Sequence, residues 1–335
     1  MGIVANTKRP YYVYFHSPCF DGIVSAALTW DFLERREGRT VKKAIPVGYN
    51  IRSRWLSRKL LTPCAVVDFP YHRQAAFWAD HHSNPFLDKD AKRDFKRRPR
   101  GPWVVYDGRA GSCALLLHRH FADCFGFKNP RYDEMVEWAD KIDSARYASV
   151  VEAVLGDAPA LQIRASLAAG KGQALSRQLV HKLRKSTLDQ VARLPVVRKR
   201  AAEVQRKIAA GLDRFAQAAK LHDGDIVVFD VATRKNDMIS RYAPYCFFPE
   251  ARYSVGIMRS PKSAKITAMR NPWREFPSVH LGKIFEDFGG GGHQRVGAVI
   301  LAGARARKAG SILAKITRQI REQDRRTEGA HAAKV

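Results

Sequence analysis

The sequence lacks closely spaced cysteine pairs and long apolar runs, the features that mark disulfide-rich or zinc-binding folds and membrane proteins. It contains five cysteines, at positions 19, 64, 113, 124 and 246, and no two of them form a CxxC pair. A disulfide-stabilised secreted fold or a zinc ribbon is therefore not expected, and a reducing cytoplasm is the predicted compartment. No run of about 18 apolar residues occurs, so no transmembrane helix is predicted. The polar N-terminal residues also lack the apolar segment of a signal peptide.

Acidic residues are scarce relative to basic ones. The chain holds 59 Lys and Arg against 32 Asp and Glu, a net charge of +27. Such an excess favours a polyanionic partner, either nucleic acid or an anionic membrane, although a generally basic surface gives the same count. Basic residues cluster at Lys92–Arg100 and Lys182–Lys207. Most of the excess lies in residues 151–335, which hold 34 basic and 16 acidic residues.

What is present is ample apolar material in an alternating pattern. Hydrophobic residues make up 45% of the 335 residues, enough for a sizeable core and, by length, for two domains. Short β-prone runs alternate with helical patterns in the N-terminal part; the runs are 11–15, 44–47, 65–69, 77–79 and 104–106, and the helices 21–37, 111–121 and 133–143. This alternation predicts a doubly wound parallel α/β sheet. Functional residues of such sheets collect at the carboxyl ends of the strands.

The pattern changes twice further along the chain. Residues 161–219 are rich in helix formers, with interruptions near Gly170–Gly172 and Pro195. Strand signals then return at 226–231, 253–258, 265–269 and 296–301, before a final helix at 303–321. We therefore predict an N-terminal α/β domain (1–155), a basic helical connector (156–221), a smaller C-terminal α/β domain (222–321) and a polar tail (322–335).

Side chains that commonly bind metals follow the predicted strands. They are His16, Cys19 and Asp21 after the first, Asp68 at the end of the third, Asp80, His81 and His82 at the end of the fourth, and Asp140 and Asp143 closing the helix at 133–143. Asp and His together suit Mn²⁺ or another borderline divalent cation. Two such cations bridged by a carboxylate are typical of phosphoester cleavage. Taken singly, each residue is more often a helix cap or a hydrogen-bonded structural group.

Together these motifs resemble the DHH phosphoesterase superfamily, and more narrowly its branch with an associated C-terminal substrate domain. The matching pieces are His16-x-x-Cys19-x-Asp21-Gly22, Val66-Val67-Asp68, Asp80-His81-His82-Ser83-Asn84-Pro85 and Gly289-Gly290-Gly291-Gly292-His293. The resemblance implies hydrolysis of phosphodiester bonds in short oligonucleotides or nucleotides with two divalent metals, Mn²⁺ above all. It also implies a nucleic-acid partner, and the net charge favours longer single strands as well. No membrane partner is expected. A homodimer is left open.

The resemblance also implies a role for each matching residue. His16 and Asp68 would bind the first metal. A second metal would be bound by Asp21, Asp68, His81 and Asp143, so that Asp68 bridges the two. We favour Asp143 over Asp140 because an aromatic residue follows it by four positions, as in many members. His82 would lie beside the phosphate, and Asp80 would orient a neighbouring histidine.

The glycine run and two basic residues of the C-terminal domain would contact the substrate. Backbone amides of Gly290, Gly291 and Gly292 can approach an anion closely, and His293 would then hold a phosphate or the terminal nucleotide. Arg270 could form a bidentate phosphate contact. The nearby Trp273 could stack on a base or belong to the core.

Cys19 departs from the family pattern, since many members carry Asp there. A thiolate ligand would tilt the first site from Mn²⁺ toward Zn²⁺, Fe²⁺ or Co²⁺. Alternatively, Cys19 does not bind metal and the first site is weak or filled only with substrate, or the residue is a small buried side chain. The rival to an enzyme is a catalytically inactive DHH scaffold that binds nucleotide or nucleic acid, which Cys19 and the net charge would support.

Overall fold

The computed structural model describes residues 9–98, 101–169, 172–222, 225–234 and 238–332, apart from the side chains of His293 and of residues 328–332. Within these ranges the chain folds into two compact units. The first comprises the described residues up to Arg146 and Asp157–Val204; the second comprises Tyr147–Gly156 and the described residues from Gln205 onward. No helix among the described residues is long and apolar enough to cross a membrane.

The first unit is built on a parallel sheet, as predicted. Its strands are β1 (Tyr11–His16), β2 (Val41–Val47), β3 (Cys64–Val67), β4 (Phe77–Asp80) and β5 (Val104–Tyr106). They pair in the order β2-β1-β3-β4-β5, and every neighbouring pair is parallel. This is a doubly wound order, with its switch point between β1 and β3, where ligands of such sheets bind.

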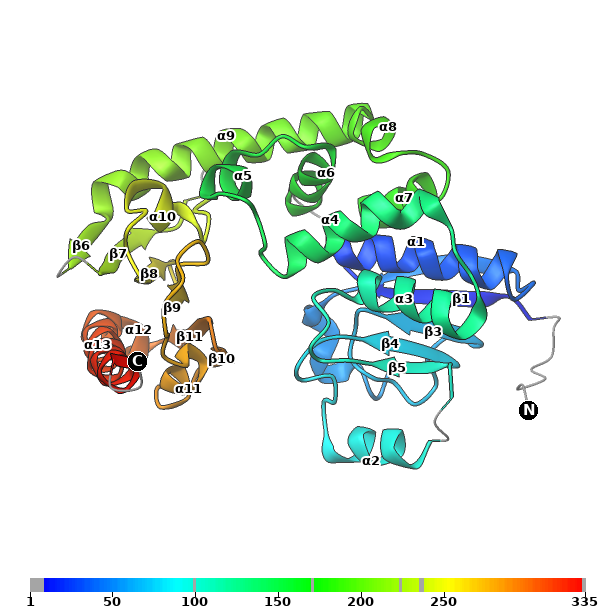
Figure 1. The fold of residues 1–335 in the computed structure, drawn as a ribbon, viewed down its shortest axis with the longest axis horizontal. Helices are drawn as coiled ribbons and strands as arrows, with labels where there is room; N and C mark the ends of the chain where they lie inside the picture. The colour runs from blue at the N-terminus through cyan, green and yellow to red at the C-terminus, as the bar shows by residue number, and fades with distance from the viewer. Residues whose placement is uncertain (1–8, 99–100, 170–171, 223–224, 235–237, 333–335) are drawn as a thin grey trace. The chain divides into compact units, whose positions relative to one another are not determined.

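Helices and loops cover both faces of this sheet. The helices of the first unit are α1 (Phe20–Arg35), α2 (Lys89–Arg97), α3 (Cys113–Phe125), α4 (Asp133–Asp143), α6 (Pro159–Ala168), α7 (Gly172–Leu183), α8 (Leu188–Ala192) and the start of α9 (Pro195–Ala218), with short 3₁₀ turns η1 (Tyr49–Arg54) and η2 (Pro130–Tyr132). In Figure 1, α1 and α4 lie above the sheet and α2 below it.

Alternation along the strands divides the core into two layers. Phe15, Val67 and Ala79 face the layer formed with α1 and α3. Val66 and Trp78 face the opposite layer, which includes η1 and α2 side chains. Both faces are apolar because a parallel sheet is buried on both sides, so only the strand ends are available for polar chemistry.

The second unit has a mixed sheet. Its strands are β6 (Lys220–His222), β7 (Ile226–Ala232), β8 (Tyr253–Arg259), β9 (Ser263–Arg270), β10 (Gly291–His293) and β11 (Val296–Ala302), and its helices include α5 (Val150–Leu155), α10 (Ala243–Phe247), α11 (Leu281–Glu286), α12 (Ala304–Arg307) and α13 (Ala309–Ala332). The order is β10-β11-β9-β8-β7-β6, and only β7 and β8 run parallel among these pairs.

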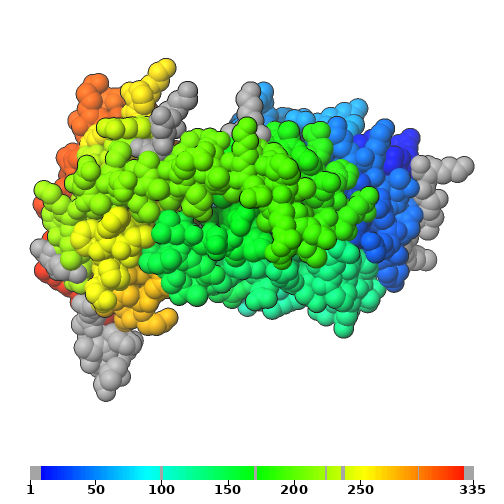
Figure 2. Space-filling model, turned by 90° about the horizontal axis from the view of Figure 1, so that it is seen from above, coloured from blue at the N-terminus to red at the C-terminus, as the bar shows by residue number. Residues whose placement is uncertain are grey.

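Helices α6 to α9 occupy most of the segment predicted as a connector, and α9 supplies residues to both units. Figure 2 looks onto α9, whose side chains form a continuous part of the surface in that view. Its Arg198, Lys199 and Arg206 are exposed. The basic cluster at Lys182–Lys207 therefore lies largely in solvent; Arg100 of the other basic cluster lies outside the described residues.

The C-terminal helix continues beyond the predicted end at Arg321. Helix α13 extends to Ala332, although we expected a polar tail from residue 322. Asp324 explains the difference, because the Tyr253 hydroxyl donates to its Oδ1 at 2.5 Å and Arg252 pairs with it. These buried polar contacts with β8 and the residue before it stabilise the part of α13 beyond Arg321, where the sequence no longer has the apolar spacing of a helix.

Candidate functional site

Residues from distant parts of the sequence meet at the carboxyl ends of β1, β3 and β4. His16 ends β1, Asp68 follows β3, and Asp80-His81-His82 closes β4. His16 Nδ1 lies 3.4 Å from Asp68 Oδ2. Since β3 lies between β1 and β4 in the sheet, Asp68 occupies the centre of the group.

The backbone at Asp68 is unusual. Its φ is +56°, in the left-handed region that non-glycine residues rarely adopt, and its N–H donates to Ala79 O at 3.0 Å. Such conformations cost about 1–3 kcal/mol and cluster at functional sites. Gly22 belongs to the same packing, because a Cβ there would lie 2.0 Å from the His16 carbonyl oxygen and 3.1 Å from Asp68 Oδ2.

His81 points one ring nitrogen at three carboxylates. Its Nε2 lies 3.5 Å from Asp21 Oδ2, 3.6 Å from Asp68 Oδ1 and 3.3 Å from Asp143 Oδ2. Its Nδ1 lies 3.1 Å from the Ala110 carbonyl, which can only accept a hydrogen bond. Burial alone would lower the pKa of His81, but the surrounding carboxylates raise it to about 10.

His82 is held by the first residue of its own motif. Its Nδ1 lies 2.7 Å from Asp80 Oδ1, which also accepts the backbone N–H groups of His81 and His82. Burial lowers the pKa of His82, whereas Asp80 and Asp68 raise it to about 9. The other ring nitrogen, Nε2, lies 3.1 Å from the Tyr49 hydroxyl.

Asp21 and Asp68 differ in how their charge is satisfied. Asp21 accepts the backbone N–H groups of Cys113 and Ala114, both at 2.8 Å, at the start of α3. Burial, followed by the charges of Asp68 and Asp143, nonetheless raises the Asp21 pKa well above its usual range. Burial also acts to raise the pKa of Asp68, but His16 and His81 hold it well below the usual range.

The structure separates the two candidate carboxylates at the end of α4, Asp140 and Asp143. Asp143 lies against His81, and its pKa is raised by burial and by Asp68. Asp140 is buried one turn earlier, pairs with Arg146, and has its Oδ1 packed against Gly111. Of the two candidates, Asp143 therefore joins the cluster and Asp140 does not.

Cys19 is near the cluster without joining it. It occupies the N-cap position of α1 and is partly exposed. Burial of the thiol, with the charges of Asp68 and Asp143, raises the pKa of Cys19 well above its usual value. The described side chains that could hold a metal form two groups without Cys19: His16, Asp68 and His82, and Asp21, His81 and Asp143.

The chemistry of the two groups fits divalent cations. Within each group the ligand atoms lie within 4.8 Å of one another. Three buried atoms of the cluster, Asp68 Oδ2, Asp80 Oδ2 and His81 Nε2, have no hydrogen-bond partner among the described residues. Buried polar atoms without partners are costly and uncommon. Histidine nitrogens and carboxylates together suit Mn²⁺, Zn²⁺ or Fe²⁺, and Asp68 can face both groups because its two oxygens point to different histidines.

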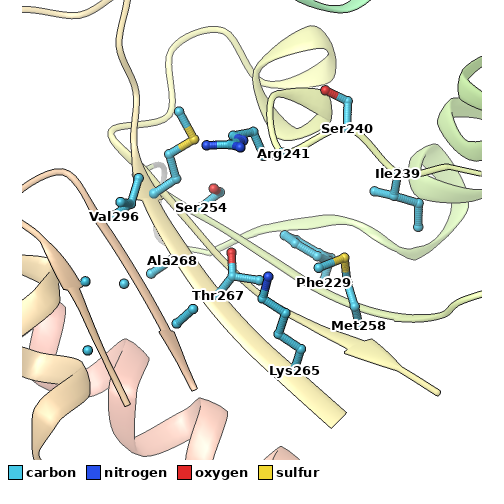
Figure 3. Close-up of a pocket in the computed structure, with 15 residues that line it drawn as sticks. Phe229, Ile239, Ser240, Arg241, Ser254, Met258, Lys265, Thr267, Ala268 and Val296 are labelled. Carbon is cyan, nitrogen blue, oxygen red and sulfur yellow. The ribbon is translucent and has the colours of Figure 1, made fainter. Parts of the chain in front are cut away.

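The predicted substrate residues lie in the second unit, and two of them line a pocket. A cavity of about 260 Å³ opens on the face of its sheet, and Gly291 and Gly292 form part of its wall. Figure 3 shows Thr267 and Lys265 of β9 and Arg241 beside this cavity. Gly290 packs against β11 instead, because a Cβ there would lie 2.3 Å from the Ala298 carbonyl oxygen.

The two predicted basic contacts are placed differently. The backbone of His293 pairs with Val296 in β11, and its side chain lies outside the described atoms. Arg270 is buried and donates to the carbonyls of Asn271 and Phe276, at 2.9 and 3.1 Å. Trp273 packs within the unit, and its Nε1 donates to the Tyr147 carbonyl at 2.9 Å.

Sequence reasoning missed two tyrosines and one carbonyl at this group of candidate metal ligands. Tyr49 follows β2 and Tyr106 ends β5, so the rule that strand ends carry function would have found both. The Ala110 carbonyl, which fixes the His81 ring, has no sequence signal because any residue supplies it.

Comparison with known proteins supports the fold. No family model matches the chain, and no curated protein matches it significantly in sequence. A pGpG-specific phosphodiesterase, PggH of Vibrio cholerae, is similar in structure over 92% of this chain and 99% of its own, with a TM-score of 0.68 and 19% identity. RecJ of Thermus thermophilus, solved with Mn²⁺, matches 92% of this chain and 52% of its own, with a TM-score of 0.57 and 12% identity.

These two matches show that the chain shares the fold of both proteins, which is the fold that its resemblance to the DHH superfamily predicts. The predicted fold class, a parallel α/β domain, a helical middle and a C-terminal α/β domain, is thereby confirmed.

Proposed function

We propose that the chain is a metal-dependent phosphoesterase that hydrolyses phosphodiester bonds in short oligonucleotides or nucleotides. One observation carries the proposal: six His and Asp side chains from four distant segments converge at the switch point of a DHH fold. They are His16, Asp21, Asp68, His81, His82 and Asp143. Structural ion pairs seldom leave buried carboxylate and imidazole atoms without partners, as this group does.

In this proposal the two groups hold two divalent cations. His16 and Asp68 serve the first, and Asp21, Asp68, His81 and Asp143 serve the second, with Asp68 shared. When bound, such cations neutralise charge on a phosphoryl group and lower the pKa of a bound water. Mn²⁺ is the proposed cofactor, and Zn²⁺, Co²⁺ or Fe²⁺ is favoured in its place if Cys19 moves to join the first group.

His82 is proposed to contact the phosphate. Asp80 holds its Nδ1 at 2.7 Å, which leaves Nε2, 3.1 Å from the Tyr49 hydroxyl, as the nitrogen that would meet substrate. Fixing one ring nitrogen by a carboxylate orients the other, as in many sites where a histidine handles a proton. The grouping of His82 with His16 and Asp68 offers a second role, metal binding, in the absence of substrate.

The second unit is proposed to bind the rest of the substrate. Amides of the glycine run, Gly290 to Gly292, and the side chain of His293 would contact a phosphate or terminal nucleotide. The cavity beside Gly291 and Gly292 supports this part of the proposal. Arg270 already donates to two carbonyls, so its phosphate contact would use its remaining donors.

A short linear nucleotide is the proposed substrate class. The likeness to a pGpG-specific phosphodiesterase supports a dinucleotide, and the net charge of +27 favours an anion. The five scattered cysteines, which include no CxxC pair, support a cytoplasmic location.

The test is release of mononucleotides from end-labelled dinucleotides after the purified protein is stripped with EDTA. Restoring Mn²⁺ is expected to restore turnover, and Asp68→Asn is expected to abolish both turnover and bound metal. Metal content is read by elemental analysis, independently of activity. Retained activity in Asp68→Asn would overturn its shared role.

The rival function is nucleotide binding without turnover, which the exclusion of Cys19 from the metal groups favours. Tight binding of dinucleotides with no cleavage under Mn²⁺, Co²⁺ or Zn²⁺, across RNA, DNA and cyclic dinucleotides, would decide for the scaffold and against the enzyme.

A further inference from the structure

His82 is flanked by two tyrosine hydroxyls. Tyr49 Oη lies 3.1 Å from His82 Nε2, and Tyr106 Oη donates to the His82 carbonyl at 3.1 Å. Tyr49 follows β2 and Tyr106 ends β5, and these are the two edge strands of the sheet. The two tyrosines therefore frame the row of strand ends that carries the metal cluster.

Both rings are open to solvent. Tyr49 is 44% exposed and Tyr106 is 36% exposed. Among the described residues, eight large hydrophobic side chains are exposed, and two of these are tyrosines. Both tyrosines contact His82. A single exposed aromatic ring needs no explanation. Two exposed tyrosines that contact the same histidine, at the strand ends that carry the candidate site, suggest a shared role.

Packing fixes the two rings in place. The Tyr49 ring lies 4.6 Å from the His16 ring and 5.7 Å from Phe69. Tyr106 stacks on Trp78 at 6.0 Å with an angle of 19° between the rings. Burial of the hydroxyl, followed for each by the charge of a nearby aspartate, raises the pKa of both tyrosines. Rigid neutral rings lose little conformational freedom when a ligand stacks on them.

A cation lies beside one of the rings. The Arg52 guanidinium is 5.8 Å from the centre of the Tyr49 ring, and Arg52 is itself exposed. An exposed aromatic ring with a neighbouring arginine is the pair that single-stranded nucleic-acid sites use for a base and its backbone. A phosphate without a base would gain no stacking energy from these rings.

We propose that Tyr49 and Tyr106 form an aromatic rim that stacks on a nucleobase next to the phosphate held at His82. The rim makes base-bearing phosphodiesters the preferred substrates and disfavours phosphate chains without bases. This inference rests on the proposed phosphoesterase function and names what that site selects.

The test compares 5′-phosphorylated diadenylate with two analogues that each lack one adenine. Binding is measured by calorimetry in EDTA, so that no turnover occurs, and kcat/KM is measured with Mn²⁺. Wild-type protein is expected to bind the full dinucleotide about tenfold more tightly than at least one abasic analogue, the size expected for one stacked base. Tyr49→Leu or Tyr106→Leu should remove that preference without weakening the abasic complex.

Conservative variants separate the ring from its hydroxyl. Tyr49→Phe and Tyr106→Phe keep the ring and should keep the preference. Tyr49→Met, whose side chain is similar in length and flexible, replaces Tyr49→Leu if the latter misfolds by circular dichroism. Leu61→Ala is the matched control, because Leu61 is 51% exposed and lies in the loop before β3, at the opposite end of that strand from the metal cluster.

Equal binding of diadenylate and both analogues by wild-type protein would overturn the rim. Equal weakening of all three ligands in the leucine variants would also overturn it, since that result assigns the tyrosines to positioning His82. A preference in binding that depends on the rings, combined with no turnover under any metal, would uphold the rim and refute the proposed phosphoesterase function.

Discussion

Asp143 and Asp140 lie one turn apart at the end of α4, but they have opposite surroundings. Asp143 Oδ2 is 3.3 Å from His81 Nε2, among the candidate metal ligands. Asp140 is buried outside the cluster and pairs with Arg146. Because the two carboxylates share one helix and one residue type, they form a natural matched pair for testing which one holds metal.

Asp143→Asn is expected to lose metal from the second group and to lower kcat with it. Asp140→Asn should keep its metal, since an amide can still accept from Arg146. Loss of a residue that only orients a metal ligand typically weakens metal binding about 10- to 100-fold. Asp143→Asn should weaken metal binding by more than this, because Asp143 is itself a proposed ligand. Mn²⁺ titration followed by electron paramagnetic resonance measures both variants, and equal metal loss in the two would contradict the assignment.

Gly22 sets how closely α1 approaches β1. Gly22→Ala would bring a methyl group to 2.0 Å from the His16 carbonyl oxygen, so α1 must shift. We expect a loss of about 1–3 kcal/mol in the free energy of unfolding, together with weaker metal binding, because a shift of α1 also displaces Asp21. Urea denaturation and metal content measure the two effects.

Gly310→Ala is the control for that substitution. Gly310 lies in α13, and a Cβ there would meet nothing within 4 Å. Alanine is a better helix former, so this variant should unfold at the same or slightly higher urea concentration, by up to about 1 kcal/mol. Similar destabilisation of both variants would refute the close-approach argument for Gly22.

Arg184 and Asp31 tie the segment after α7 to α1. Asp31 is fully buried; Arg184 Nε donates to its Oδ1 at 2.6 Å, and the Tyr132 hydroxyl donates to its Oδ2 at 3.0 Å. Arg184→Met removes the closer, largely buried cation and leaves buried Asp31 with only the exposed Arg35 beside it, so we expect about 3–5 kcal/mol of destabilisation. Thermal unfolding followed by circular dichroism measures the effect.

Arg35→Met tests the exposed partner of the same carboxylate. Arg35 lies 3.6 Å from Asp31 but is 60% exposed at its side chain. Exposed ion pairs contribute little, so the expected loss is below about 1 kcal/mol. A larger effect for Arg35 than for Arg184 would show that the buried pair does not hold α1.

The strand-end rule explains which site residues could be predicted. His16, Asp68 and Asp80 follow strands with clear apolar runs, so their meeting at one edge follows from a parallel sheet. Tyr49 was missed because it carries no metal-binding group, although it follows β2 in the same way. The preference for Asp143 came from the family resemblance, since helical periodicity alone cannot distinguish it from Asp140.

Tertiary contacts account for the remaining differences. Strand β10 covers only Gly291–His293, and glycine has low strand propensity, so only pairing with β11 defines it. The end of α13 depends on Asp324 meeting Tyr253, residues 71 positions apart in the chain. Partners at that separation carry no local signal in a single sequence.

The basic surface makes a separate prediction about longer nucleic acids. If α9 binds single strands through phosphates, log K for an oligothymidylate should fall linearly with log salt, with a slope of about −0.7 for each phosphate contact. Arg198 and Lys199 are exposed on α9. The double variant Arg198→Gln, Lys199→Gln should reduce the magnitude of that slope by about 1.4 if both contact phosphates.

Arg259→Gln is the control for that slope. The guanidinium of Arg259 already forms two hydrogen bonds to Asp230, at 2.7 and 2.6 Å, so its charge is compensated before any nucleic acid arrives. Removing it should leave the slope unchanged. Fluorescence anisotropy across a salt series measures all three proteins. A wild-type plot without slope would mean that the net charge of +27 serves the surface in general, and that α9 binds no strand.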